Sequence, residues 1–177
     1  MTTIYGVTGM PLAGKTTVAS VLEENGYSVL DMGDVVRKER EKRDIPVSET
    51  GTFVNEQREK RGMDAIAQLS IPYLEDLIDE TDKIVITGMR GWMEKERFEA
   101  ETQAEIEVIA VWASRETRKQ RMEQRQRDED IEGDSFHERD LRDLDNGVGK
   151  LIALSDHLIK NDSITETELE KRIEELV

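Results

Sequence analysis

The sequence contains no cysteine, which excludes a disulfide framework and a thiolate metal site. It also lacks an apolar stretch long enough to span a bilayer. The first ten residues, MTTIYGVTGM, hold no basic segment ahead of an apolar run. These absences predict a soluble, cytoplasmic protein. No internal repeat or low-complexity linker divides the 177 residues, so we expect one domain, 1–177, with a single core.

Positive charge is in short supply, with 25 Lys and Arg against 40 Asp and Glu and a formal net charge of −15. Such a surface repels nucleic-acid phosphates and argues against general nucleic-acid binding. Two explanations of the acidity stay open: adaptation to a salt-rich, halophilic cytosol, and an ordinary well-solvated acidic surface. Histidine is scarce too, and His137 and His157 are isolated enough to predict structural roles.

Strand and helix patterns alternate along the chain and predict a doubly wound α/β fold. Short apolar runs predict strands at Thr3–Thr8, Tyr27–Leu30, Lys83–Thr87, Ile106–Ala113 and His157–Ile159. Helical spacing predicts helices from Lys15 to Asn25 and over Val35–Arg43, Thr52–Arg61, Ala65–Ile78, Arg115–Arg127, Phe136–Leu144 and Gly149–Leu154, with Pro72 starting or kinking one of them. A capping box of Thr165 and Glu168 predicts the last helix. The result is a mainly parallel five-stranded sheet that binds its ligand at the carboxyl ends of the strands.

The stretch GMPLAGKTT fits the pattern G-x-x-x-x-G-K-[ST] between a predicted strand and a predicted helix. In such a loop the backbone amides turn onto phosphate oxygens, Lys15 reaches the β- and γ-phosphates, and the Thr16 hydroxyl binds Mg²⁺. The predicted ATP-binding residues are Gly9, Met10, Pro11, Leu12, Ala13, Gly14, Lys15, Thr16 and Thr17. A glycine turn without a ligand is disfavoured, because the lysine and threonine serve no packing purpose.

Two arginines follow strand ends, Arg37 in GDVVR and Arg90 in GMR. Because strand ends of a doubly wound sheet meet beside the loop, we expect both to clamp a second, phosphate-bearing molecule. Taken singly, each also fits a surface salt bridge. The string nearest to the base-reading N-K-x-D of a GTPase, at 160–162, lacks that order, which disfavours a GTPase switch.

The loop and GDVVR resemble adenylate kinase and other nucleoside monophosphate kinases, and DMGD from Asp31 resembles dephospho-CoA kinase. On VTGMP, MGDVVR and ERDLR, the chain is most similar to an uncharacterised archaeal kinase-like family, number two hundred of the uncharacterised series. The resemblance spans most of the chain and implies a P-loop kinase fold. It implies an acceptor-side helical insertion at about 33–80 and a small lid at about 126–136. It also places Asp34 near the acceptor and Arg37 on the acceptor phosphate.

A stripe of Arg118, Arg121 and Arg125 lies on one face of a predicted helix. It resembles the lid-bearing helix of these kinases, whose arginines reach the donor nucleotide, with Arg139 and Arg142 returning from the far side of the lid. Arg121 and Arg125 are the preferred pair. A solvated face paired with neighbouring carboxylates is the alternative.

Three residues depart from the kinase pattern. Thr87 stands where relatives carry an aspartate that organises Mg²⁺ through water, TGMR lacks the proline that precedes the matching arginine, and Met32 replaces a small hydroxyl residue beside an acceptor adenine. The departures leave metal handling and the identity of the acceptor open.

The sequence therefore predicts an ATP- and Mg²⁺-dependent phosphotransferase, monomeric or homodimeric, whose small acceptor resembles a nucleoside monophosphate or dephospho-CoA. The predicted catalytic residues are Lys15, Asp34, Arg121 and Arg125, and the predicted acceptor-binding residues are Asp34, Arg37, Arg90, Arg139 and Arg142. The alternative, supported by Thr87, is a slow ATPase or a nucleotide-dependent assembly factor.

Overall fold

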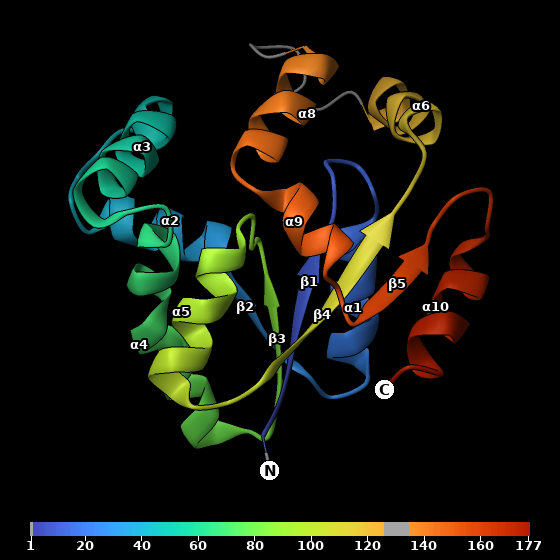
Figure 1. Ribbon diagram of the computed structural model, residues 1–177, viewed down its shortest axis with the longest axis horizontal. Helices are drawn as coiled ribbons and strands as arrows, with labels where there is room; N and C mark the ends of the chain where they lie inside the picture. The colour runs from blue at the N-terminus through green and yellow to red at the C-terminus, as the bar shows by residue number, and fades with distance from the viewer. Residues whose placement is uncertain (1, 126–134) are drawn as a thin grey trace.

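A computed structural model describes residues 2–125 and 135–177, without the side chain of Arg125, so the predicted lid at 126–136 lies almost wholly outside the described residues. The described residues form one five-stranded sheet in the order β2-β3-β1-β4-β5. The strands are β1 (Thr3–Thr8), β2 (Ser28–Asp31), β3 (Lys83–Thr87), β4 (Ile106–Trp112) and β5 (His157–Lys160). Every pairing in this sheet is parallel, which confirms the predicted fold class (Figure 1).

Helices cover both faces of the sheet, and loops and further helices lie above its upper edge in Figure 1, where the strands end. In chain order they are α1 (Lys15–Glu24), α2 (Met32–Glu41), the 3₁₀ turn η1 (Val47–Glu49), α3 (Thr50–Arg61), α4 (Ala65–Glu80), α5 (Trp92–Thr102), α6 (Arg115–Arg125), α8 (Phe136–Asp145), α9 (Val148–Ala153) and α10 (Glu166–Glu174). Among the described residues, no helix is both long and apolar enough to cross a membrane.

The sheet separates two apolar clusters, because successive strand residues point to opposite faces. On one face, Ile84 and Ile86 of β3 pack with residues of α2, α4, α5 and α9, including the fully buried Phe98. On the other face, Val85 packs with α1 and α10, whose Leu22 and Ile173 are fully buried. The strands are therefore sandwiched between helical layers, and only their ends can carry a site.

Several element boundaries differ from the predicted ones. Helix α2 starts at Met32, three residues before the predicted Val35, because the Asp31 carboxylate caps it by accepting a hydrogen bond from the Asp34 amide at 2.9 Å. Helix α4 runs through Pro72 from Ala65, so the proline does not start it. Helix α5 was not predicted at all.

The two tryptophans, which the sequence suggests are packing residues, differ in their surroundings. Trp92 is half-buried against the core, whereas Trp112, at the end of β4, is 38 % exposed. Trp112 lies at the rim of a cavity of about 450 Å³ together with Leu141, Leu144 and Ile152. The packing role is therefore wrong for Trp112, whose ring meets solvent along an apolar groove.

A cluster of charged side chains joins α2 to α4. The buried Glu39 carboxylate accepts hydrogen bonds from Lys42 at 2.8 Å, Arg43 at 2.6 Å and the Tyr73 hydroxyl at 2.9 Å. The Lys42 hydrogen bond is the largest of the effects that lower the pKa of Glu39 to about 2, and burial opposes them. This carboxylate therefore ties α2 to α4 while it is ionised.

We expect Glu39→Gln to lower the free energy of unfolding by about 1 to 3 kcal/mol at neutral pH, since charge-assisted hydrogen bonds are lost. The folded-state pKa lies below the ordinary value, so this contribution is present above about pH 4.5 and fades as pH falls towards 2. Urea unfolding of both proteins at neutral and acid pH measures it. Glu59→Gln, on the exposed side of α3, is the matched control. A pH-independent difference between parent and variant would contradict the assignment.

Candidate functional site

The loop between β1 and α1 has a backbone that two glycines make accessible. Gly9 and Gly14 have φ values of 149° and 105°, in a region that L-residues rarely adopt. A Cβ on Gly9 would lie 2.4 Å from the Val111 carbonyl oxygen, and one on Gly14 would lie 2.2 Å from Nδ2 of Asn161. Gly14 also begins α1, so the helix N-terminus is directed at this loop.

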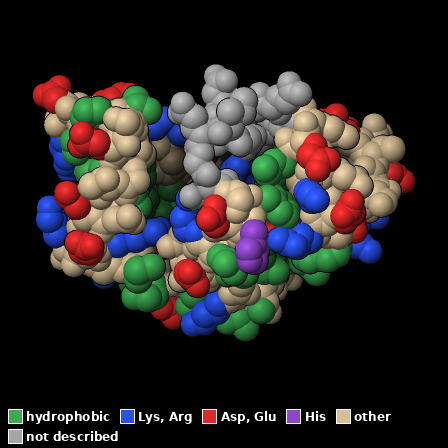
Figure 2. All heavy atoms as spheres, turned by 90° about the horizontal axis from the view of Figure 1, so that it is seen from above, with side chains coloured by type: hydrophobic (Ala, Val, Ile, Leu, Met, Phe, Trp, Pro, Cys, Tyr) green, Lys and Arg blue, Asp and Glu red, His purple; other side chains and the backbone are tan. Residues whose placement is uncertain are grey.

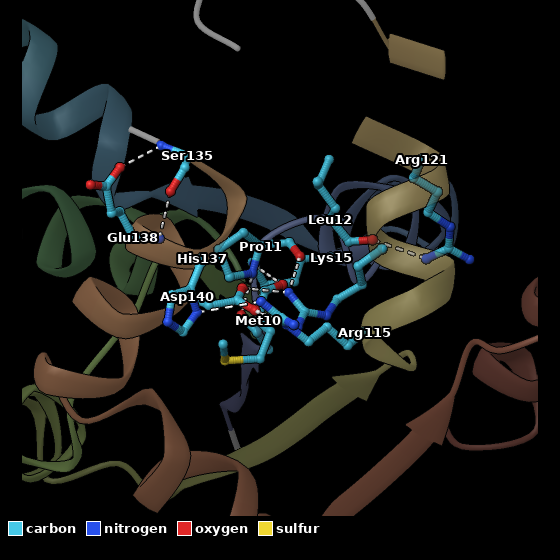
Figure 3. Close-up of polar contacts among 12 residues, drawn as sticks. Met10, Pro11, Leu12, Lys15, Arg115, Arg121, Ser135, His137, Glu138 and Asp140 are labelled. Carbon is cyan, nitrogen blue, oxygen red and sulfur yellow. Dashed lines mark hydrogen bonds and ion pairs between the residues drawn. The ribbon is translucent and has the colours of Figure 1, made fainter. Parts of the chain in front are cut away.

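Lys15 turns back towards the start of the loop. Its Nζ donates hydrogen bonds to the Gly9 carbonyl at 2.7 Å and the Met10 carbonyl at 2.9 Å (Figure 3). Burial lowers the pKa of Lys15 to about 8, the Asp143 carboxylate opposes this, and the nearby Arg90 guanidinium adds to it. Lys15 is therefore a desolvated cation that a polyanionic ligand would stabilise.

Arg121 supports the loop from α6. Its guanidinium donates to the carbonyls of Leu12 at 3.0 Å, Ala13 at 3.1 Å and Asn161 at 2.9 Å, and Figure 3 shows it reaching Leu12. The Asn161 amide, just after β5, donates to the Ala13 carbonyl at 2.8 Å. The carbonyl side of the loop is thus occupied by donors. Arg121 lines the first cavity, but its guanidinium holds the loop in place.

Arg118 does not belong to a solvated stripe. It is buried and makes a two-bond ion pair with Asp140 of α8, at 2.6 and 2.8 Å, and donates to the Pro11 carbonyl at 3.1 Å. One guanidinium thereby joins α6, α8 and the loop. The third member of the predicted stripe, Arg125, has its side chain outside the described part of the chain.

Two cavities of about 650 Å³ each open at the carboxyl edge of the sheet. The first lies over the loop, and its lining includes Lys15, Thr16, Gln124, Arg139 and Ile164. Thr16 is exposed there. Six of the nine predicted ATP-binding residues line this cavity, and Gly9, Met10 and Ala13 do not.

The second cavity lies between the end of β2, α2 and α3. Its wall includes Asp31, Met32, Arg37, Asn55, Arg58 and Asn146. Arg90 and Arg142 line both cavities, so the two spaces share a wall of cationic side chains. Figure 2, which looks down on this edge, shows Lys and Arg side chains around the hollow between the lobe on the left and the middle of the molecule.

The carboxylates at the end of β2 and in the first turn of α2 have distinct neighbours. Asp34 forms an ion pair with Arg37, and both side chains are exposed. Asp31, which lines the second cavity, accepts a hydrogen bond from the Thr87 hydroxyl at 2.9 Å. Asp34 itself is not among the described residues that line either cavity. A carboxylate from β2 therefore lies beside the threonine that replaces the expected aspartate at the end of β3.

Arg90 is placed by two acidic residues. Its guanidinium pairs with the buried Asp143 at 3.1 Å, and its backbone amide donates to the Glu94 carboxylate at 2.7 Å. Glu94 is buried at the start of α5, and this burial raises the pKa of its carboxyl group. These contacts fix one of the two arginines that line both cavities.

Sequence reasoning missed Arg58, Glu94, Asp143, Asn146 and Asn161. Asn161 belongs to the string at 160–162 that fails the GTPase pattern, and nothing in that string indicates a bond to the loop. Arg58 is one of several charged residues on a polar helix. Their roles depend on contacts between segments distant in the chain. Among the described residues, no group of three acidic, His or Cys side chains forms a metal cluster.

Comparison with known proteins places these features in a family. The family model described as AAA domain matches residues 6–142. A UPF0200 protein of Pyrococcus furiosus is 38 % identical, over 97 % of this chain and 94 % of its own. A UPF0200/UPF0201 protein of Archaeoglobus fulgidus is 35 % identical over 95 % of this chain, which spans only 53 % of that protein. The shikimate kinase of Acinetobacter baumannii has a similar fold, with a TM-score of 0.60 at 19 % identity and 99 % and 92 % of the two chains covered.

We expect Asp140→Asn to destabilise the protein by about 3 kcal/mol or more, because it leaves the buried Arg118 guanidinium without its counter-charge. Thermal unfolding at neutral pH measures the effect. Asp145→Asn, on an exposed part of α8, removes the same charge and should change the midpoint little. Equal midpoints for the two variants would mean that the ion pair does not hold α6 to α8.

Proposed function

The chain belongs to the archaeal UPF0200 family of P-loop kinase-like proteins, and we propose that it transfers the γ-phosphoryl group of ATP to a small acceptor. The observation that carries this proposal is the pair of adjoining cavities with Arg90 and Arg142 in their common wall. A nucleotide-hydrolysing enzyme needs one such space, whereas a phosphotransferase needs two that meet where the phosphoryl group passes.

In this proposal the first cavity holds ATP. The loop amides and the α1 N-terminus face its phosphates, and Lys15 leaves its carbonyl partners to contact the β- and γ-phosphates. Thr16 is exposed on the cavity wall, so its hydroxyl fits as a ligand of Mg²⁺. The ion, when bound, supplies positive charge that offsets the charge on the transferring group. Arg139 lines the same cavity and adds to that positive charge.

The acceptor occupies the second cavity. Arg37 from α2 and Arg90 from the loop after β3 hold its anionic group, and Arg142 lies between acceptor and donor. Asp34 orients Arg37 through their ion pair. Asp31 lines the cavity and, in this proposal, accepts the proton of an acceptor hydroxyl, whereas Asp34, a predicted catalytic residue, lines neither cavity among the described residues. Catalysis then rests mainly on positioning and charge stabilisation.

The lowered pKa of Lys15 predicts that ATP binding takes up protons under alkaline conditions. Phosphates raise this pKa from about 8 towards its ordinary value, so the complex is more protonated than the free protein at about pH 8.5. Affinity should fall as pH rises above 8, by up to about tenfold per pH unit. Titration calorimetry in buffers of different ionisation enthalpy measures the uptake. Lys15→Arg stays charged throughout and should show none; equal uptake by parent and variant would assign the proton elsewhere.

A direct test uses γ-labelled ATP with a panel of nucleoside monophosphates, dephospho-CoA and small alcohols. Label in a new compound supports the phosphotransferase. Lys15→Ala should abolish transfer without lowering the thermal midpoint, because its ammonium faces the loop and supplies charge instead of core volume. Equal turnover by parent and variant would refute the proposal.

A second candidate function is nucleotide-dependent assembly with another protein. The observation that favours it is the Archaeoglobus fulgidus relative, whose name joins UPF0200 to UPF0201 and of which this chain spans 53 %. The apolar groove beside Trp112 offers a surface for such a partner. In this case the label would appear only in inorganic phosphate, and a UPF0201 protein would change the rate of its release.

A further inference from the structure

The second cavity concentrates positive charge in a chain whose formal net charge is −15. Arg37, Arg58, Arg90 and Arg142 all line it, from different segments of the chain. The carboxylates on the same wall are already engaged: Asp31 accepts from Thr87 and the Asp34 amide, and Glu94 accepts from the backbone amides of residues 90 and 91. The cavity is therefore suited to an anion.

Arg58 differs from Arg37 and Arg90 in its partner. Arg37 pairs with Asp34 and Arg90 with Asp143, but Arg58 donates from Nη1 to a neutral group, the Asn146 side-chain oxygen, at 2.8 Å. Among the described residues no carboxylate lies within ion-pair distance of it. Its Nε is buried and has no hydrogen-bond partner. A guanidinium placed in this way is costly unless an anion joins it.

Burial is also the main influence on the ionisation of this side chain. It lowers the pKa of Arg58, and the repulsion from Arg90 adds to this effect while Glu94 and Asp143 oppose it. Arginine remains charged even so. The electrostatic surroundings of Arg58 therefore favour the binding of an anionic group of a ligand on the α3 side of the cavity.

We propose that Arg58 is a specificity-determining residue that binds an oxyanion of the acceptor, a phosphate or a carboxylate, with Asn146 as its neutral partner. The terminal nitrogens of the guanidinium, which belongs to the cavity wall, donate charge-assisted hydrogen bonds to the oxyanion. The apolar side chains of Met32, Val36 and Val54 line the same cavity and contact the body of the acceptor. The acceptor is thus a small organic anion that binds to Arg58, a residue that the sequence analysis did not predict.

This inference rests on the proposed function, because only that function makes the bound anion a phosphoryl acceptor. Its test measures binding and needs no phosphoryl transfer. The full-length protein is saturated with Mg²⁺ and a non-hydrolysable ATP analogue, so that the loop is occupied. Two probe pairs are then titrated, AMP against adenosine and glycerate against glycerol. Each pair compares an anion with its neutral counterpart, the first for phosphate and the second for carboxylate.

The parent should bind the anion of at least one pair about tenfold or more tightly than its neutral counterpart. Arg58→Gln should weaken that anion by about tenfold and leave the neutral compound within about twofold. Arg61→Gln, the same charge change on the exposed end of α3, should alter neither. Preference in the AMP pair identifies a phosphate, and preference in the glycerate pair identifies a carboxylate.

A second variant tests the proposal even if Arg58→Gln does not fold. Asn146→Asp keeps the side-chain shape and sets a carboxylate against Nη1 of Arg58, so it should weaken the anion while preserving or raising the thermal midpoint. Thr50→Asp adds the same charge to the cavity wall from the start of α3, far along the helix from Arg58, and should weaken the anion less.

The proposal is overturned if the parent prefers neither anion, if Arg58→Gln keeps the preference, or if Asn146→Asp and Thr50→Asp weaken the anion equally. The phosphotransferase proposal fails differently, by an absence of label in any acceptor. If an anion binds through Arg58 but receives no label, the proposed anion site is supported and the proposed phosphotransferase activity is refuted.

Discussion

The carbonyl oxygens of the loop must be held from behind if its amides are to face a ligand, and much of the site follows from this constraint. Arg118 holds the Pro11 carbonyl, Arg121 holds those of Leu12 and Ala13, and Asn161 adds a second donor to Ala13. These donors come from α6 and from the end of β5, so the loop conformation depends on the far half of the sheet. The Arg118–Asp140 pair then extends the support to α8, which carries Arg139 and Arg142.

Acidic residues make this concentration of arginine tolerable. Buried or half-buried guanidinium groups repel one another at low dielectric, and each needs a counter-charge or a polar partner. Asp140 and Asp143, three residues apart on α8, neutralise Arg118 and Arg90 respectively. Helix α8 thus supplies a counter-charge beside the P-loop and another at the wall between the cavities. Its acidic residues therefore stabilise buried arginines in addition to forming a solvated surface.

The loop and the strands could be predicted because their signals are local. The spacing of Gly9, Gly14 and Lys15 and the run from Lys83 to Thr87 depend on neighbouring residues alone. Helix α5 escaped prediction because it buries little apolar surface beyond Phe98 and reads as a charged loop. Arg58 and Asn146 are 88 residues apart, so no local pattern indicates their hydrogen bond. The ion pair of Arg118 with Asp140 likewise has no signal in the sequence. The fold could therefore be predicted from the sequence. Which arginines support the loop and which line the cavities without contacting it could not be predicted.

The shared wall gives the two cavities an electrostatic reason to fill together. Two polyanions brought to within bonding distance repel each other strongly where water is excluded, and Arg90 and Arg142 lie where that repulsion would be greatest. A guanidinium between them lowers the repulsion for both ligands at once. Since Arg90 is fixed by Asp143 and Glu94, its charge needs no rearrangement when the second ligand arrives. In the proposed phosphotransferase, the same preorganisation that permits two anions to meet would also favour the charge that develops on a phosphoryl group passing between them.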